Sequence, residues 1–315
     1  MNEDLKNIEV HNNSIDVLKG LLILAVIVGH MLLGTLNESL PRMLIYAFHM
    51  PVFFFISGWL INVRKILELS IGGLLKKYSL RMLIQWFIAL CVFTVLTNYP
   101  NISWKVLGYS LLNPYYHLWF VPTLFIMILL LWIVGKIIRG WQMLFLLLVI
   151  SVFFIPVQPY ISSISCAIRL RFMLWFVIGL ICKKITCELL SLFPIKWLWI
   201  GGILFNLIIL IPLHYLHVEP WRIYEKYFMI PYCLYICLLL VPSCINKNNL
   251  KSRTFEFIGK HSLEIYLWHM VPVFFLKKYF IDNLNVYYGI NFSIILLFLL
   301  VVYFLLSKRV KNKVY

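Results

Sequence analysis

The stretch IDVLKGLLILAVIVGH, residues 15–30, decides the fold. Charged side chains stand only near its start, at Asp16 and Lys19, and ten uncharged residues then lead to His30. A helix needs about 20 mainly apolar residues to cross a bilayer, and the run from Val17 to Leu36 reaches that length. It predicts a first membrane span, which we expect to stay uncleaved because no small-residue cleavage site follows it.

The composition of the whole chain agrees with a membrane protein. Of 315 residues, 63% are hydrophobic and 13% are charged, and the mean hydropathy is +0.91. Soluble domains carry about twice that share of charge, so the composition argues against a soluble enzyme or a nucleic-acid-binding domain. Long unbroken apolar runs also exclude a β-barrel, whose strands alternate polar and apolar residues. The seven Cys form no CxxC pair, and we interpret them as buried hydrophobic side chains and not as metal ligands.

The same length criterion, applied along the chain, predicts an all-α polytopic membrane protein with a single bundle of about ten transmembrane helices. We expect one domain over residues 1–315, with a short cytoplasmic segment at 1–15 and a cytoplasmic tail at 307–315. The expected spans are Val17–Leu36, Leu44–Val63, Leu80–Thr97, Leu118–Val134, Trp141–Ile155, Ser163–Ile181, Trp197–Tyr215, Phe228–Cys244, Leu263–Phe280 and Ile290–Leu306. The fifth of these is short, so its neighbour could share the crossing.

The distribution of basic residues predicts the orientation. With the N-terminus inside, the inner segments hold 19 Lys and Arg and the outer segments hold 8, while Lys19 stands at the inner mouth of the first span. Inner loops of membrane proteins are enriched in Lys and Arg. Both termini are therefore expected in the cytoplasm, and the net charge of +16 indicates orientation and not a nucleic-acid partner.

Three ionisable residues share one face of the first predicted helix. A step of about 100° per residue places Lys19 about 20° and Asp16 about 40° around the helix from His30, with His30 roughly 16 Å further along than Lys19. Ionisable groups inside a membrane are costly and mark functional sites by default. The plainer alternatives are an interfacial ion pair for Asp16 and Lys19, and a hydrogen-bonding role for His30.

Further polar side chains of the predicted spans are candidates for lining a path through the bundle. His49, His117 and Trp119 lie toward the outer side, although a helix cap and an aromatic belt also explain such residues. Arg169 and Arg171 are two residues apart, so they face different directions, and at least one is expected to snorkel. The remaining candidates are Glu264, which a helix cap also explains, and His269, which is placed near mid-depth.

The inner loop before the third span carries Lys77 and Arg81 one turn apart. The positive-inside rule explains them as well as a function does. In the functional interpretation they contact phosphate, because Lys and Arg make strong charge-assisted hydrogen bonds to it. A basic inner mouth would attract an anionic ligand, and histidines deeper in the bundle could supply acid–base chemistry.

Four segments together resemble a known family. IDVLKGLLILAVIVGH, AFHMPVFFFISGWL, HLWFVPTLF and FIGKHSLEIYLWH occur in the order found in the acyltransferase 3 family of integral membrane acyltransferases, between residues 15 and 269. The chain looks closest to the branch of fucose 4-O-acetylase and related acetyltransferases. The hallmark of the family is a basic residue, ten intervening residues and a histidine, which Lys19 and His30 match.

The resemblance implies an enzyme with ten membrane helices in a bacterial cytoplasmic (inner) membrane. It implies an acyl-CoA donor, commonly acetyl-CoA, and O-acylation of a carbohydrate acceptor of the cell envelope. In the family the hallmark histidine is essential, and basic residues of the inner loop help to hold the donor. The loop departs from the family pattern, because Tyr78 stands where the first of two arginines is usual and Gln85 stands where a proline is usual.

The chemistry of acyl transfer fits these residues. A thioester is already activated, so no metal is needed, while a sugar hydroxyl needs a base, a role that fits His30. A transient acyl-histidine is the alternative, and Asp16 would position Lys19. A multi-spanning transporter of a glycan precursor or an ion is the rival class, since buried histidines and arginines suit proton-coupled transport too. The absence of a detectable internal repeat weighs against it.

Overall fold

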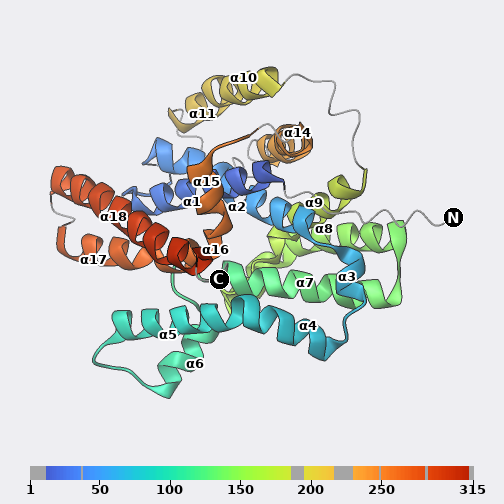
Figure 1. Ribbon diagram of the computed structural model, residues 1–315, viewed down its shortest axis with the longest axis horizontal. Coiled ribbons are helices and arrows are strands. Elements are labelled where there is room, and N and C mark those ends of the chain that lie inside the picture. Colours follow the sequence, from blue (N-terminus) through green and yellow to red (C-terminus); the bar gives the residue numbers. More distant parts are fainter. Residues whose placement is uncertain are drawn as a thin grey trace.

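The computed structural model describes residues 12–36, 38–185, 195–215, 230–247, 250–280 and 283–311. The expected cytoplasmic N-terminal segment lies mostly outside these residues, and the expected C-terminal tail lies outside them from residue 312 on. All regular elements of the described ranges are helices, which run alongside and across one another in a single assembly (Figure 1). The predicted all-α fold class is therefore confirmed.

Short helices alternate with long ones along the described ranges, and three π-helical stretches and one 3-10 turn carry the label η. In chain order the elements are α1 (Asn13–Met31), α2 (Leu40–Leu60), α3 (Val63–Leu67), α4 (Ile71–Tyr78), η1 (Ser79–Leu83), α5 (Ile84–Asn98), α6 (Trp104–Leu112), α7 (Phe120–Ile137), α8 (Gly140–Ile164), η2 (Leu170–Phe172), α9 (Met173–Ile185), α10 (Ile195–Phe205), η4 (Asn206–Leu210), α11 (Ile211–Tyr215), α13 (Ile230–Tyr235), η6 (Ile236–Leu240), α14 (Val241–Lys247), α15 (Arg253–Lys260), α16 (Ser262–Trp268), α17 (Met270–Phe280) and α18 (Leu284–Lys311).

Six helical stretches are long and apolar enough to cross a membrane, judged by length and composition over the described residues. They are Asn13–Met31, Leu40–Leu60, Ile71–Asn98, Phe120–Ile137, Gly140–Ile164 and Leu284–Phe304. The other four expected segments form shorter or interrupted helices, such as Lys196–Ile209 and Ile230–Asn246.

Two expected spans have different bounds in the structure. The fifth is not short, because α8 continues through Pro156 and Pro159 to Ile164. The sixth is not one helix from Ser163 to Ile181, because the chain leaves α8 at Ser165 and resumes helical structure in η2 and α9. The break falls in a stretch that is more polar than the helices on either side of it, with Ser162, Ser163, Ser165, Arg169 and Arg171.

Glycines let two pairs of helices approach closely. A Cβ atom on Gly20 of α1 would collide with the carbonyl oxygen of Phe255 in α15, and one on Gly259 of α15 would collide with that of Asp16. The pair of α2 and α9 is built in the same way around Gly58 and Gly179. Small residues at helix crossings are a general device of membrane proteins, and the first pair fixes the start of α1 against α15.

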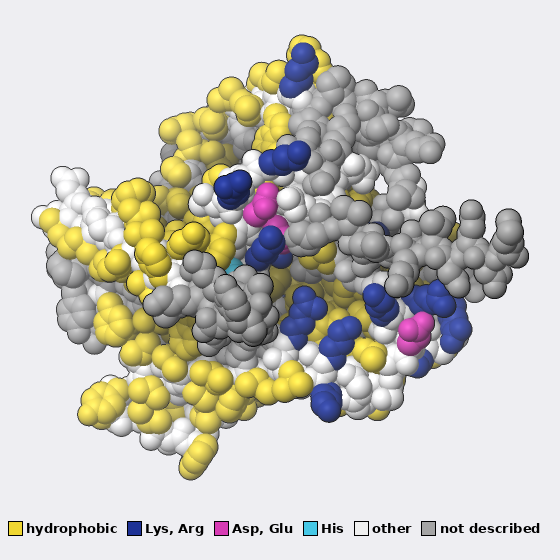
Figure 2. All heavy atoms as spheres, viewed as in Figure 1, with side chains coloured by type: hydrophobic (Ala, Val, Ile, Leu, Met, Phe, Trp, Pro, Cys, Tyr) yellow, Lys and Arg dark blue, Asp and Glu magenta, His cyan; other side chains and the backbone are white. Residues whose placement is uncertain are grey.

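The basic side chains gather toward one end of the assembly. Lys and Arg lie over the centre and the right of the face in Figure 2, while hydrophobic side chains cover much of its left half. This basic end includes the start of α1, the short helix α3, the end of α7 and the end of α9. The opposite end includes the C-terminal residue of α1, Met31, whose carbonyl accepts a hydrogen bond from the Tyr287 hydroxyl of α18.

Candidate active site with three histidines beside a basic cavity

Three histidines from distant parts of the sequence converge in the interior. The ring centroid of His30, near the end of α1, lies 6.1 Å from that of His117 and 5.4 Å from that of His269. The rings of His117 and His269 lie 4.6 Å apart. His117 stands in the turn before α7, and His269 stands at the junction of α16 and α17. The structure thus brings together three of the histidines that the sequence predicts as candidates.

Backbone hydrogen bonds fix the orientation of two of these rings. His269 uses Nδ1 toward the carbonyl oxygen of Tyr266, at 2.7 Å, and His117 uses Nε2 toward that of Leu267, at 3.3 Å. A neutral imidazole that donates from one nitrogen carries its lone pair on the other. The lone pairs therefore lie on Nε2 of His269 and Nδ1 of His117.

Those two lone-pair nitrogens have no hydrogen-bond partner among the described residues, although both are buried. Buried polar atoms in native proteins nearly always have a partner. Because the two nitrogens belong to neighbouring rings, they mark a place where a bound group with a proton to give would be received. The described residues contain no group of His, Cys, Asp and Glu arranged to hold a metal ion.

Tyrosines join the cluster to its surroundings. The hydroxyl of Tyr46 lies 3.4 Å from Nδ1 of His30, and its ring lies 4.9 Å from that of His49. His49 itself is buried and bonds through Nδ1 to the carbonyl of Ile45, at 2.7 Å. Tyr46 therefore lies between His49 and the three-histidine cluster, and His49 is not a member of that cluster.

The turn that carries His117 has an unusual backbone. Tyr116 has a φ of 48°, in the left-handed region that non-glycine residues rarely occupy. The hydroxyl of Tyr266 donates a hydrogen bond to the carbonyl of His117, and the two rings lie 4.9 Å apart. Such backbone conformations persist where surrounding contacts hold them and are common at functional sites.

A cavity of about 350 Å³ opens at the basic end and reaches Tyr266. Lys19, Lys65, Lys77 and Arg81 supply its basic side chains, and apolar residues of α2 and α7 line most of the rest. Lys77 and Arg81, predicted one turn apart, lie on either side of the start of η1. The cavity is therefore a mainly apolar space with cationic groups on its wall and Tyr266 between it and the histidines.

Asp16 and Lys19 form an ion pair near the cavity. Their Oδ1 and Nζ atoms are 3.0 Å apart, and the side chains are 6% and 21% exposed. Lys19 lines the cavity, whereas Asp16 does not. The shared helix face deduced from the sequence is consistent with this pair.

The surroundings of Glu264 can be read from its neighbour His261, which precedes α16. Burial lowers the pKa of His261, the charge of Glu264 opposes that shift, and the charge of Lys19 adds to it. Glu264 is half-buried in the first turn of α16. It therefore lies near the region of Lys19 and His261, one helical turn or more before His269. The structure does not bring it into the histidine cluster.

Arg169 and Arg171 have separate surroundings. The guanidinium of Arg169 stands 4.3 Å from the ring centroid of Trp119, whose other contacts include Phe172 in a stacked arrangement at 5.5 Å. Arg169 also lies within electrostatic range of Tyr46 and Tyr266. Arg171 lies over Phe172, and its backbone N–H donates to Gln158. Arg169 and Trp119 thus adjoin the cluster, and Arg171 lies within electrostatic range of Arg169.

Sequence reasoning missed Tyr46, Tyr266 and Lys65. Each stands in or beside a segment already singled out: Tyr46 precedes AFHMPVFFFISGWL, and Tyr266 lies inside FIGKHSLEIYLWH. A tyrosine in an apolar segment is typical of membrane interfaces, so its type gave no signal. The position of Tyr266 three residues before His269 is the one sequence feature that indicated a role for it.

The chain matches the family model described as an acyltransferase domain over residues 12–307. No curated protein matches it, and no solved structure matches it. The matched range contains the three histidines, the residues that line the cavity and all the other candidate site residues.

Proposed function

Since this chain belongs to the acyltransferase domain family over nearly its whole length, we propose that it is a membrane-embedded O-acyltransferase. It moves an acyl group, which we propose to be acetyl, from acyl-CoA to a hydroxyl of a cell-envelope or exported glycan precursor. The observation that carries the proposal is the adjacency of the basic cavity and the three histidines, with Tyr266 between them.

The cavity suits the donor. Acyl-CoA is anionic at its nucleotide end and carries its thioester at the end of a long thin arm. Lys19, Lys77 and Arg81 offer charge-assisted hydrogen bonds to phosphate, and the apolar wall accommodates the arm. In this arrangement the thioester reaches Tyr266 and the histidines beyond it.

The histidines suit the acceptor. The acceptor oxygen attacks the thioester carbonyl carbon while its proton passes to a neutral imidazole nitrogen. Collapse of the tetrahedral intermediate breaks the bond between carbon and sulfur, and the departing CoA thiolate takes that proton. His30 is the proposed base, and the lone pairs of His117 and His269 hold the acceptor hydroxyl or share its proton.

Trp119, Arg169 and His49 are proposed to line the acceptor's side of the cluster. An aromatic ring covered by a guanidinium offers a flat face and hydrogen-bond donors, which are the groups that a polar sugar ring contacts. Glu264 and Arg171 receive no role in this proposal, because neither lies in the cluster or lines the donor cavity.

The proposed placement is a bacterial inner membrane, crossed about ten times, with both termini in the cytoplasm. Six long apolar helices support the multi-pass arrangement, and the remaining four crossings are assigned to the shorter helices. The basic end then faces the cytoplasm, where acyl-CoA is made.

The experiment that tests the proposal is acyl transfer from radiolabelled acetyl-CoA in membranes that contain the protein and its envelope glycans. Native protein should label a glycan fraction, and mass spectrometry should show that fraction heavier by one acyl group per modified site. A protein that transports a precursor without transferring acyl groups would leave the glycan mass unchanged.

A further inference from the structure

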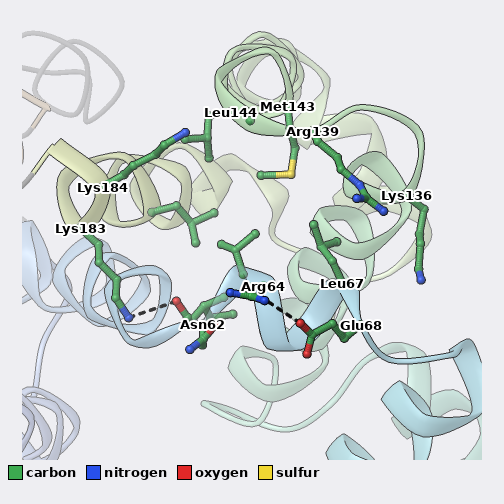
Figure 3. A pocket seen from close by; sticks show the side chains of 14 residues that line it. Asn62, Arg64, Leu67, Glu68, Lys136, Arg139, Met143, Leu144, Lys183 and Lys184 are labelled. Carbon is green, nitrogen blue, oxygen red and sulfur yellow. Dashed lines mark hydrogen bonds and ion pairs between the residues drawn. The ribbon is translucent and has the colours of Figure 1, made fainter. Parts of the chain in front are cut away.

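A second basic cavity, of about 860 Å³, lies at the same end of the assembly (Figure 3). It is bounded by α3, by the turn between α7 and α8, and by the end of α9. Five basic side chains and a single carboxylate, Glu68, are among its lining residues, and Figure 3 shows them around the hollow. The basic ones are Arg64, Lys136, Arg139, Lys183 and Lys184.

Helix α3 separates this cavity from the donor cavity. Lys65 and Ile66 line the donor cavity, whereas Arg64, Leu67 and Glu68 line the second one. Ile61 and Asn62, just before α3, border both cavities. The second cavity is therefore adjacent to the donor site without sharing any of its basic side chains.

The charge of the second cavity is largely uncompensated. Glu68 pairs with Arg64 at 3.2 Å, in an exposed pair that contributes little free energy in water. Lys183 donates to the carbonyl of Ile61 at 3.3 Å, and Lys184 lies 4.0 Å from the ring centroid of Trp141. Four cationic side chains thus remain without a carboxylate partner among the lining residues, which is the electrostatic signature of an anion site.

Apolar groups complete the cavity. Leu67, Met143, Leu144 and Leu180 lie on its walls, and the neighbouring face of α8 exposes Trp141 and Phe145. A free anion makes no favourable contact with apolar walls, whereas a phospholipid presents a phosphate joined to apolar acyl chains. Basic pockets between transmembrane helices near a membrane surface are typical headgroup sites.

We propose that this cavity binds the headgroup of an anionic phospholipid, with the acyl chains lying along the exposed apolar face of α8. The site requires the membrane placement proposed for this protein but does not require acyl transfer. The bound phosphate would accept charge-assisted hydrogen bonds from Lys136 and Arg139, which stand close in sequence at the end of α7 and the start of α8, and would lie against the segment that borders the donor cavity.

The test is native mass spectrometry of the full-length purified protein titrated with phosphatidylglycerol or with phosphatidylcholine of the same acyl chains. The native protein should retain phosphatidylglycerol preferentially. The double variant Lys136→Gln/Arg139→Gln should bind it about thirtyfold more weakly, since the loss of each basic residue near a membrane surface weakens binding about fivefold. The matched control, Lys77→Gln/Arg81→Gln, removes two charges from the donor cavity and should keep the lipid.

Three results would overturn the proposal. Equal retention of the two lipids by the native protein would remove the headgroup site. Displacement of phosphatidylglycerol by inorganic phosphate alone, at millimolar concentration, would make the cavity a free-anion site. Loss of acetyl-CoA affinity with unchanged lipid retention in Lys136→Gln/Arg139→Gln would assign the cavity to the donor. Arg139→Gln alone, at an exposed position, provides a variant expected to fold. Acetyl-CoA binding reports that the variants of Lys136 and Arg139 have folded, and a native thermal unfolding midpoint reports it for Lys77→Gln/Arg81→Gln.

Discussion

Tyr266 donates its hydroxyl hydrogen bond to the backbone carbonyl of His117, and the two rings meet edge to face at 4.9 Å. The same tyrosine lines the basic cavity, and His117 does not. One side chain therefore contacts the proposed donor cavity on one side and the histidine cluster on the other. It also holds in place the turn in which Tyr116 has its left-handed backbone conformation.

Tyr266→Phe is expected to preserve donor binding and to slow acyl transfer. The ring still fills the space, but the lost hydrogen bond frees the turn that carries His117. A net hydrogen bond is worth about 1 kcal/mol, so a loss of up to about tenfold in kcat is expected. Steady-state kinetics with acetyl-CoA checks this, and an unchanged kcat would show that the hydrogen bond does not position His117.

Removing the charge of Lys19 or of Arg81 from the donor cavity is expected to weaken donor binding. A hydrogen bond to a charged group contributes about 1.5–3 kcal/mol, so Lys19→Ala and Arg81→Ala should each raise the Kd for acetyl-CoA by about ten- to a hundredfold. Calorimetry on purified protein measures this. Lys105→Ala, in α6 at the opposite end, is the control and should bind normally. Native affinity in both cavity variants would remove the donor from this cavity.

The glycine contact between α2 and α9 is expected to determine stability. Gly58→Ala places a methyl group against the Phe176 carbonyl, which is backbone and cannot move aside cheaply. Overpacking of this kind costs about 1–3 kcal/mol, which should appear as a lower thermal unfolding midpoint in detergent. Gly108→Ala is the matched control, because nothing lies within 4 Å of its added Cβ. Equal midpoints for the two variants would contradict the close approach.

Opposite ends of the assembly are expected to lie on opposite sides of the membrane. A cysteine introduced at Gly72, in α4 at the basic end, should react with a membrane-impermeant maleimide only from the cytoplasm. One at Asn285, in the first turn of α18, should react only from outside. Both positions are exposed. The experiment uses protein that lacks its native cysteines, and the reverse labelling pattern would place the basic cavity on the side without acyl-CoA.

The first helix could be understood from the sequence because a single helix obeys a fixed period. That period predicts the common face of Asp16 and Lys19, and the ion pair between them requires nothing else. The convergence of His30 with His117 and His269, unlike the ion pair within α1, involves three separate parts of the chain. It depends on how α1, the turn before α7 and the junction of α16 and α17 pack together, and no local spacing encodes such tertiary contacts.

Breaks inside apolar segments were equally hard to predict. The residues around His269 are as apolar as the helices on either side. Serines and two arginines surround Ser165, but a criterion of length and average hydropathy still merges both breaks into continuous spans. Hydrogen bonds reveal the first break, since Ser165 donates to the carbonyl of Leu112 and Thr123 donates to that of Ala167. Side chains from other helices stabilise this irregular backbone, as expected inside a membrane protein.

His30→Gln is expected to abolish acyl transfer while leaving donor binding intact. Glutamine keeps a polar group of similar size but cannot take a proton, and a general base contributes about a hundredfold to ten-thousandfold to the rate. His30 does not line the donor cavity, so the Kd for acetyl-CoA should stay native. Because the base acts in its neutral form, native activity should rise with pH through the pKa of the cluster, and residual activity of the variant should lack that rise.

Companion variants identify the base within the cluster. His269→Gln removes the lone pair on Nε2 and should also slow transfer, whereas His11→Gln, outside the described residues, should have no effect. Intact mass of the native protein after incubation with acetyl-CoA and no acceptor distinguishes direct transfer from an acyl-histidine, because only the latter adds an acyl group to the chain. Near-native turnover by His30→Gln would leave His30 as a hydrogen-bonding partner of Tyr46 and move the role of base to His269 or His117.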